Sequence, residues 1–263
     1  MTDITHRHDD AVAYERFMGR WSRAVGMTFL DWIAPPKNAR WLDVGCGSGA
    51  FTELVLNSYF PADIVGIDPS AEQIDHVRGL PLGQRADFRV ADALTLPFPD
   101  GTFDVVASAL VINFIPDRLR ALAEMRRVTR PGGLVAGYVW DFASEGAPNA
   151  PIRLGMRRMG LAAPAAVGTD ASRLDALISL FESTGFQNIE SRMINIAVAF
   201  RDFDDFWQSQ TPTYNNIGKV IERLPDADRR KLKEAAQDFV TSAADGSVTY
   251  PARANAIKAR VPE

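Results

Sequence analysis

The chain carries the segment Arg40-Trp41-Leu42-Asp43-Val44-Gly45-Cys46-Gly47-Ser48-Gly49-Ala50-Phe51, in which an apolar run ends in three alternate glycines. A further apolar run at 51–56 is compatible with a helix. Glycine is needed where the backbone takes a positive φ or passes close to a ligand. A turn from a strand into a helix also presents free backbone N–H groups to whatever lies above it. The order of residues therefore predicts a strand, a tight ligand-facing turn and a helix.

Two kinds of nucleotide-binding site are compatible with this turn. Gly45-x-Gly47-x-x-Ala50 satisfies the dinucleotide fingerprint, and Asp68 follows where a ribose-binding acid is expected, so an NAD(P)-dependent oxidoreductase is one alternative. Asp43 argues against it, because a carboxylate at the end of the strand would repel a pyrophosphate and attract an ammonium or sulfonium. S-adenosylmethionine carries both of these cations and no phosphate. The other interpretation of Asp43 is a helix or turn cap.

Leu42-Asp43-Val44-Gly45-Cys46-Gly47-Ser48-Gly49 resembles the first motif of the class I S-adenosylmethionine-dependent methyltransferases that act on small molecules. The resemblance runs from Tyr14 to Gly133 and returns near the C-terminus. It implies an α/β fold with a doubly wound, Rossmann-like sheet of seven strands, mostly parallel, with an antiparallel last strand and helical lid insertions. It also implies S-adenosyl-L-methionine as the cofactor, held by the turn residues Gly45, Cys46, Gly47 and Gly49.

Hydrophobic patterning places the elements along the chain. Strands are expected at 40–44, 62–67, 88–90, 102–108, 134–139, 186–200 and 247–261. Helices are expected at 14–33, 49–59, from 71, and at 117–129, 171–184 and 226–242. Pro35-Pro36 should stop the first helix, and the run 130–133 should close the helix at 117–129.

One domain is expected, divided into a cap, a core and a lid. The N-terminal helical cap is 1–36, the methyltransferase core is 37–141 and 171–200 with 245–263, and the lid insertions are 142–170 and 201–244. The first insertion is rich in Ala, Gly and Pro and is interpreted as a long loop, which in a compact domain is usually functional or flexible. The second is expected to contribute a helical pair between the two strands of a hairpin.

Composition limits the possible partners. The chain has 263 residues and a net charge of -4, which gives no electrostatic footprint for nucleic acid. It has one cysteine, so no disulfide forms within the chain. The first ten residues are polar and acidic, and no apolar run approaches the length of a membrane span. We therefore expect a cytoplasmic protein that acts on a small-molecule methyl acceptor, without nucleic acid or membrane.

Acidic residues follow the second and third expected strands. Asp68, with Pro69 after it, is expected to accept both hydroxyls of an adenosine ribose, and Ser70 is the better cap for the helix that begins at 71. The resemblance implies that Asp92 meets the adenine amine and that the backbone N–H of Ala93 meets a ring nitrogen. The alternative interpretation of Asp92 is an aspartate in a turn, with no contact to a ligand.

Other candidates lie around the same edge of the sheet. The residues from Ser108 to Asn113 should face the methyl donor, because ligands bind where the strand order reverses. The resemblance also implies that the N-terminal segment folds over the cofactor, which would place Tyr14 in the site and pair Arg20 with the methionine carboxylate. The alternative for this segment is an amphipathic helix that covers one end of the sheet.

Aromatic and acidic residues nearer the C-terminus are candidates for the acceptor pocket. Trp140 could wall the pocket, and Asp141 could act as a base or bind a cation. Phe206, Trp207 and Tyr214 could roof it, although packing of the insertion onto the core is the alternative for each.

The expected activity is methyl transfer from S-adenosylmethionine to a small molecule, with alignment and exclusion of water as the main requirements. The family that this chain resembles often has His where Asn113 and Phe114 stand here, so the resemblance implies no base and no catalytic residue is named. No cluster of potential metal ligands is present. A base is optional where the acceptor is already nucleophilic. The alternatives are the oxidoreductase and a protein that binds S-adenosylmethionine without transferring its methyl group.

Overall fold

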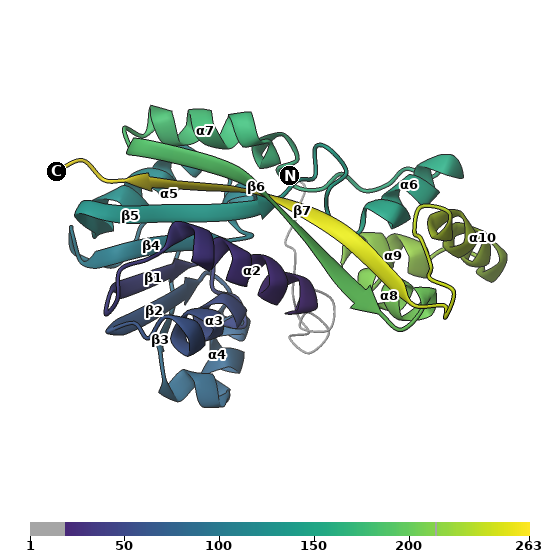
Figure 1. The fold of residues 1–263 in the computed structure, drawn as a ribbon, viewed down its shortest axis with the longest axis horizontal. Helices are drawn as coiled ribbons and strands as arrows, with labels where there is room; N and C mark the ends of the chain where they lie inside the picture. Colours follow the sequence, from purple (N-terminus) through teal and green to yellow (C-terminus); the bar gives the residue numbers. More distant parts are fainter. Residues whose placement is uncertain (1–18, 214) are drawn as a thin grey trace.

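The computed structural model describes residues 19–213 and 215–263. Its centre is a seven-stranded sheet in the order β3-β2-β1-β4-β5-β7-β6 (Figure 1). The strands are β1 Arg40–Val44, β2 Asp63–Asp68, β3 Asp87–Val90, β4 Phe103–Ala109, β5 Thr129–Trp140, β6 Gln187–Phe200 and β7 Val248–Arg260. The pairings from β3 to β5 are parallel, whereas β7 runs antiparallel to both β5 and β6. The predicted fold class is confirmed.

Apolar side chains cover both faces of the sheet. On one face α2 Arg20–Ile33 and α3 Ala50–Ser58 pack beside Trp41. On the other face α5 Arg118–Val128 and α7 Leu174–Ser183 pack beside Leu42. Trp41 and Leu42 are neighbours on β1, and successive side chains of a strand point to opposite faces. The central, parallel part of the sheet is therefore buried on both sides, as parallel strands require.

The remaining elements of the parallel half complete this frame. The helix α4 Ala71–Gly79 covers β2 and β3, with Ile74 and Val77 buried beside Phe88. Its N-cap is Ser70, whose Oγ accepts the backbone N–H of Gln73 at 3.3 Å, as predicted. Short 3₁₀ turns follow at η2 Pro81–Gln84, η3 Ile112–Phe114 and η4 Asp170–Ser172.

The strands β1 and β4 lie side by side at the centre, and the order of strands reverses between them. Successive strands run outward from β1 through β2 and β3, and the chain then returns to β4 on the other side of β1. Ligands of open α/β sheets bind outside the carboxyl ends of the strands at such a point. The glycine turn after β1 and the segment after β4 therefore meet at the expected edge.

The second half of the chain differs from the sequence prediction in three places. The segment 142–170 contains a helix, α6 Ala150–Arg158, where a loop was expected. The segment between β6 and β7 contains three helices where a pair was expected: α8 Phe203–Gln210, α9 Asn216–Glu222 and α10 Asp226–Gln237. The run 130–133 belongs to β5, which begins directly after α5. Thr129 Oγ1 donates to Met125 O at 2.6 Å and helps to end that helix without a glycine cap.

The helices α6 and α10 pack together, although they come from different insertions (Figure 1). A Cβ atom on Gly155 of α6 would lie 3.0 Å from the backbone nitrogen of Ala236 of α10, so the two helices approach closely. The guanidinium of Arg158 pairs with the carboxylate of Asp238 at 2.5 Å. Beyond the ends of β6 and β7, these two helices lie with α8 and α9 at one end of the molecule (Figure 1). None of the helices in the described ranges combines the length and apolarity needed to cross a membrane.

Candidate functional site

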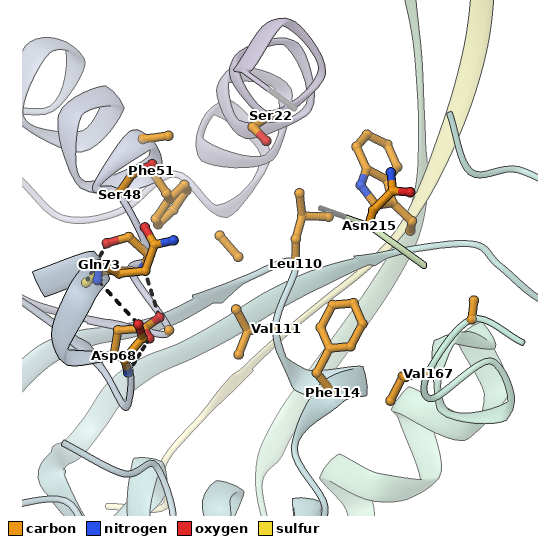
Figure 2. A pocket seen from close by; sticks show the side chains of 18 of the residues that line it. Ser22, Ser48, Phe51, Asp68, Gln73, Leu110, Val111, Phe114, Val167 and Asn215 are labelled. Atoms are coloured by element: carbon orange, nitrogen blue, oxygen red, sulfur yellow. Dashed lines mark hydrogen bonds between the residues drawn. The ribbon is translucent and has the colours of Figure 1, made fainter. Parts of the chain in front are cut away.

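A pocket of about 1100 Å³ lies at the carboxyl ends of β1, β2, β4 and β5. Figure 2 shows Asp68 and Gln73 at one end and Phe114, Val167 and Asn215 at the other. The first end, which we call the turn half, is lined by 45–48, Ala50, Phe51 and 68–73. The second, the insertion half, is lined by 109–111, Phe114, Tyr138, Trp140, Phe142, Pro148, Asn149, Arg153, 164–167 and 215–217. Ser22 of α2 also lines the pocket.

The glycines of the β1–α3 turn have different roles. All three have positive φ, which is 82° at Gly45, 51° at Gly47 and 87° at Gly49. A Cβ atom on Gly45 would lie 2.5 Å from a methyl group of Val111, and one on Gly49 would lie 2.6 Å from Leu82. A Cβ atom on Gly47 would meet nothing within 4 Å. Gly45 and Gly49 are therefore required by packing, and Gly47 leaves space open to the pocket.

The predicted cofactor residues of this turn are only partly brought together. Gly45, Cys46 and Gly47 line the pocket, whereas Gly49 faces Leu82 and Val77 behind it. The backbone N–H groups of Gly45 and Cys46 donate to Ile67 O at 2.8 and 2.9 Å, which fastens the turn to the end of β2.

Asp43 lies beneath the turn and outside the pocket lining. Its side chain is fully buried, and Thr52 Oγ1 donates to its Oδ2 at 2.7 Å. Its second oxygen, Oδ1, is buried without a hydrogen-bond partner among the described residues. Desolvation raises the pKa of Asp43 to about 7, against the hydrogen bond from Thr52, and nearby Asp68 adds to the rise. Asp43 is therefore held against the first turn of α3 by Thr52, and it does not line the pocket.

Asp68 ends β2 and lines the pocket together with Pro69. Its carboxylate accepts the backbone N–H of Gly47 at 3.1 Å and that of Ser70 at 2.9 Å (Figure 2). Burial raises the pKa of Asp68 although these two hydrogen bonds oppose the rise. The side chain is therefore a half-buried hydrogen-bond acceptor held in place at the turn half.

Four other predicted cofactor residues lie outside the pocket lining. Asp92 is exposed, and its Oδ1 accepts the backbone N–H of Leu94 at 2.9 Å, while Ala93 is buried in the core. Ser108 and Asn113 are fully buried, and Asn113 Nδ2 donates to Val167 O at 3.1 Å.

Arg20 lies on α2 and is engaged elsewhere. Its Nη1 is 3.3 Å from Asp205 Oδ2, and its guanidinium lies over the ring of Phe200, 5.4 Å from the ring centre. It does not line the pocket. Tyr14 lies outside the described residues.

Comparison with known proteins finds similarity to methyltransferases. Residues 42–137 match the family model described as a methyltransferase domain. An uncharacterised methyltransferase of Schizosaccharomyces pombe is 37% identical over 118 residues, which cover 41% of this chain and 42% of that protein. The demethylmenaquinone methyltransferase of Roseiflexus castenholzii is 41% identical over 106 residues, 39% of this chain and 43% of that protein. The chain thus spans less than half the length of either curated relative.

Solved structures extend the similarity in fold to most of the chain. A putative methyltransferase from Bacillus halodurans C-125 has a TM-score of 0.59 and 18% identity, covering 90% of this chain and 99% of its own. Phosphoethanolamine N-methyltransferase 2 of Haemonchus contortus, bound to S-adenosylhomocysteine and phosphomonomethylethanolamine, also reaches 0.59 with 18% identity, covering 95% of this chain and 56% of its own. Residues 42–137 thus match a methyltransferase domain, and the solved structures share the fold of most of the chain.

The residues predicted to form the acceptor pocket do not all line it. Trp140 lines the pocket at the end of β5. Asp141 is buried and pairs with Arg253, whose Nε and Nη2 both lie 2.8 Å from Asp141 Oδ2, so its charge is already compensated. Phe206 and Trp207 are buried in the core beside Phe203. This is the alternative given for them, in which they pack the insertion onto the core. Tyr214 lies outside the described residues.

Much of the insertion half was missed by sequence reasoning. The exception is 109–111, which line the pocket within the run from Ser108 to Asn113 that was expected to face the methyl donor. Leu110 has a φ of 63° and donates its backbone N–H to Tyr138 O at 2.8 Å. Arg153 and 164–167 come from the segment expected to be a lid, but nothing in its sequence singled them out. Gly168 allows this segment to lie against Asn113, which follows β4. A Cβ atom on residue 168 would collide with the backbone oxygen of Asn113.

Few ionisable groups line this pocket. Those among the described lining residues are Cys46, Asp68, Glu72, Tyr138 and Arg153. Burial raises the pKa of the Cys46 thiol well above its ordinary value, so it is not an activated nucleophile. No group of three or more potential metal ligands occurs within the described chain.

Proposed function

We propose that this protein is an S-adenosylmethionine-dependent methyltransferase that acts on a small molecule. The observation that carries the proposal is one continuous pocket. It joins the glycine turn and Asp68 of a methyltransferase domain to a second, largely apolar half built by the insertions. A pocket of about 1100 Å³ is at the upper end of the range for small-molecule sites, which suits a cofactor and an acceptor together.

The residues of the turn half fit an adenosyl cofactor. Gly47 leaves open space over the turn, and the half-buried Asp68 supplies carboxylate oxygens that suit the two hydroxyls of a ribose. Asp92, exposed after the neighbouring β3, remains our candidate for the adenine amine. When bound, S-adenosylmethionine supplies a methyl group on a positively charged sulfur.

Charge separates this proposal from an oxidoreductase. Asp68 and Glu72 line the turn half. Acidic side chains here favour a cation and disfavour the pyrophosphate of a nicotinamide cofactor. The described lining residues include no lysine, and their one arginine belongs to the insertion half.

The chain's own contribution to catalysis is enclosure and alignment. Leu110, Phe114, Trp140 and Phe142 form apolar walls that exclude water from the insertion half. No histidine occurs among the described lining residues, so no side chain is assigned as a general base. Holding two reactants in line is by itself a large source of acceleration.

We further propose that α6 and the helices between β6 and β7 act together as the lid over the acceptor, as their mutual packing supports. A net charge of -4 supports a small molecule rather than a nucleic acid as the partner. The single cysteine, free and buried, fits our assignment of the protein to the cytoplasm.

Calorimetry with S-adenosylhomocysteine and with NAD tests the proposal. We expect binding of the first and none of the second. Methyl transfer from radiolabelled S-adenosylmethionine to a metabolite pool then separates an enzyme from a protein that only binds the cofactor. Tight NAD binding without S-adenosylhomocysteine binding overturns the proposal.

A further inference from the structure

The insertion half of the pocket has mostly apolar walls. Leu110 and Phe114 follow β4, and Phe142, Val167 and Ile217 come from the two insertions. Phe114 is 39% exposed, a large apolar side chain open to the pocket rather than packed in the core. Figure 2 shows Phe114, Leu110 and Val167 around this half. Such walls suit an acceptor with an apolar body.

Arg153 introduces a positive charge into these walls. It projects from α6, is half-buried and lines the pocket, and its Nη1 donates to Pro164 O at 2.5 Å. A guanidinium has five N–H donors, so most of its capacity is left after this bond. Desolvation holds the pKa of Arg153 below its ordinary value, which shows that the charge is partly removed from water.

No carboxylate of the described chain compensates this charge at ion-pair distance. Glu145 is the acid that acts on the pKa of Arg153, and it pairs with Arg157 at 2.7 Å. The buried Asp141 is held by Arg253. A partly buried cation without a paired anion is costly, and an anionic ligand would compensate it.

Trp140 lines the same half, is 5% exposed and contributes its ring to the wall. Its indole Nε1 is buried away from the pocket and has no hydrogen-bond partner. Arg153 is therefore the charged donor at this end of the pocket. The acids that line the pocket, Asp68 and Glu72, belong to the turn half. The pocket therefore has an acidic end and a basic end.

We propose that the insertion half binds an apolar organic anion, a carboxylate or a phenolate, whose oxygen pairs with Arg153 and whose body packs against Phe114, Phe142 and Val167. This assignment of an acceptor class rests on the proposed methyltransferase function. It also accounts for the lack of histidine among the described lining residues, because an acceptor that arrives ionised needs no proton removed.

A pair of matched probes tests the charge requirement. Binding of 2-naphthoate and of its neutral amide, 2-naphthamide, is measured by calorimetry with and without S-adenosylhomocysteine. We expect the wild-type protein to bind the naphthoate at least about tenfold more tightly, as charge-assisted hydrogen bonds imply. Equal affinities, or no binding of the naphthoate, overturn the proposal.

Variants then assign the preference to Arg153. Arg153→Met should abolish the difference between the two probes, and Arg153→Lys should retain most of it. Arg158→Met is the control, because it removes the same charge from the exposed side of α6, where Arg158 pairs with Asp238. A preference that survives in Arg153→Met overturns the proposal.

Binding of S-adenosylhomocysteine distinguishes failure of the proposed function from failure of the proposed acceptor class. If the wild-type protein does not bind it, the proposed function fails, while the preference for the naphthoate can still be measured. If it binds and the naphthoate preference is absent, only the acceptor class fails. Thermal unfolding of each variant shows whether the fold is retained, and Arg153→Lys keeps the test valid if Arg153→Met loosens 164–167.

Discussion

The turn half and the insertion half of the pocket are built in different ways. The turn half consists of two short segments, 45–51 and 68–73, in which backbone conformation and one carboxylate determine the shape. The insertion half gathers side chains from five segments spread between residues 109 and 217. One half depends on glycines and local turns, and the other on long-range packing of α6 against α10 and of Asn113 against 164–168.

The proposed methyltransferase function explains this difference. A half that holds the same cofactor in many proteins can be encoded by a short motif, whereas a half that selects the acceptor can vary by insertion. It also separates the expected effects of mutation. Changes in the turn half should alter cofactor binding or the stability of the core, and changes in the insertion half should leave the cofactor in place.

The largest expected effect is that of Gly45→Ala. The added methyl group would lie 2.5 Å from Val111 at a φ of 82°, so overpacking and backbone strain act together. We expect a loss of about 4 kcal/mol in the free energy of unfolding, measured by urea denaturation with circular dichroism.

Gly47→Ala is the matched variant. Its methyl group meets nothing within 4 Å, so we expect a loss of only about 1 kcal/mol from the left-handed backbone. Its affinity for S-adenosylhomocysteine should fall, because the methyl group occupies the open space above the turn. Equal free energies of unfolding of the two variants would show that Val111 leaves room for a side chain at position 45.

The next effect is a pH dependence from Asp43. Its pKa is raised to about 7 by burial, so the folded protein binds this proton more tightly than the unfolded chain, in which an aspartate has a pKa of about 4. The associated stability is fully present below pH 4 and is lost as the pH rises through about 7. The rise in pKa from about 4 to about 7 corresponds to about 4 kcal/mol, and this contribution should be absent in Asp43→Asn.

Asp104 provides a control of opposite sign. Hydrogen bonds from the Arg40 backbone and the Arg130 side chain outweigh desolvation and lower its pKa. Its contribution is present above the pKa of the unfolded chain and is lost as the pH falls through the folded value. Urea denaturation from pH 3 to 8 on Asp43→Asn and Asp104→Asn measures both. The free energy of unfolding of the wild-type protein minus that of Asp43→Asn should fall as the pH rises. A difference that rises with pH contradicts the raised pKa of the buried Asp43.

Asp68→Ala should act on binding more than on folding. Loss of a charged hydrogen-bond acceptor is expected to weaken S-adenosylhomocysteine binding by about 1–3 kcal/mol, measured by calorimetry. Asp75→Ala is the control, because Asp75 is exposed on α4 and pairs only loosely with Arg78 at 3.8 Å. Normal binding by Asp68→Ala would remove the ribose assignment.

The same contrast explains what the sequence could predict. The turn at 45–49, the Ser70 cap and Asp68 depend on residues close in the chain, and their placement followed from local rules. Asp141 and Arg20 were assigned to ligands because their partners were not visible. Arg253 lies 112 positions from Asp141, and Asp205 lies 185 positions from Arg20.

The helix α6 was missed for a similar reason. Its sequence contains Pro151 and Gly155, both poor helix formers, so composition favoured a loop. Proline is tolerated in the first turn of a helix, and Gly155 is the site of close approach to Ala236 of α10. Packing against a distant helix therefore outweighed the local preference, and the position of Arg153 could not be predicted without it.

Asn113→Ala should weaken the insertion half alone. Asn113 is fully buried and donates to Val167 O, so we expect a loss of about 1 kcal/mol from this hydrogen bond. Hydrogen exchange should show lower protection in 164–170, with S-adenosylhomocysteine affinity unchanged. A large loss of cofactor affinity would instead support the sequence prediction that Asn113 faces the cofactor.

The smallest expected effect is that of Arg20→Met. The side chain of Arg20 is 49% exposed, and Arg201 also lies near Asp205, with its Nε 3.6 Å from Oδ2. An exposed pair of this kind contributes about 0.5 kcal/mol, so the free energy of unfolding should fall by about that amount in both Arg20→Met and the control Arg201→Met. Calorimetry with S-adenosylhomocysteine should find less than a twofold change in both. A tenfold loss confined to Arg20→Met would mean that Arg20 leaves Asp205 to bind the methionine carboxylate, and the boundary between the two halves would then have to include α2.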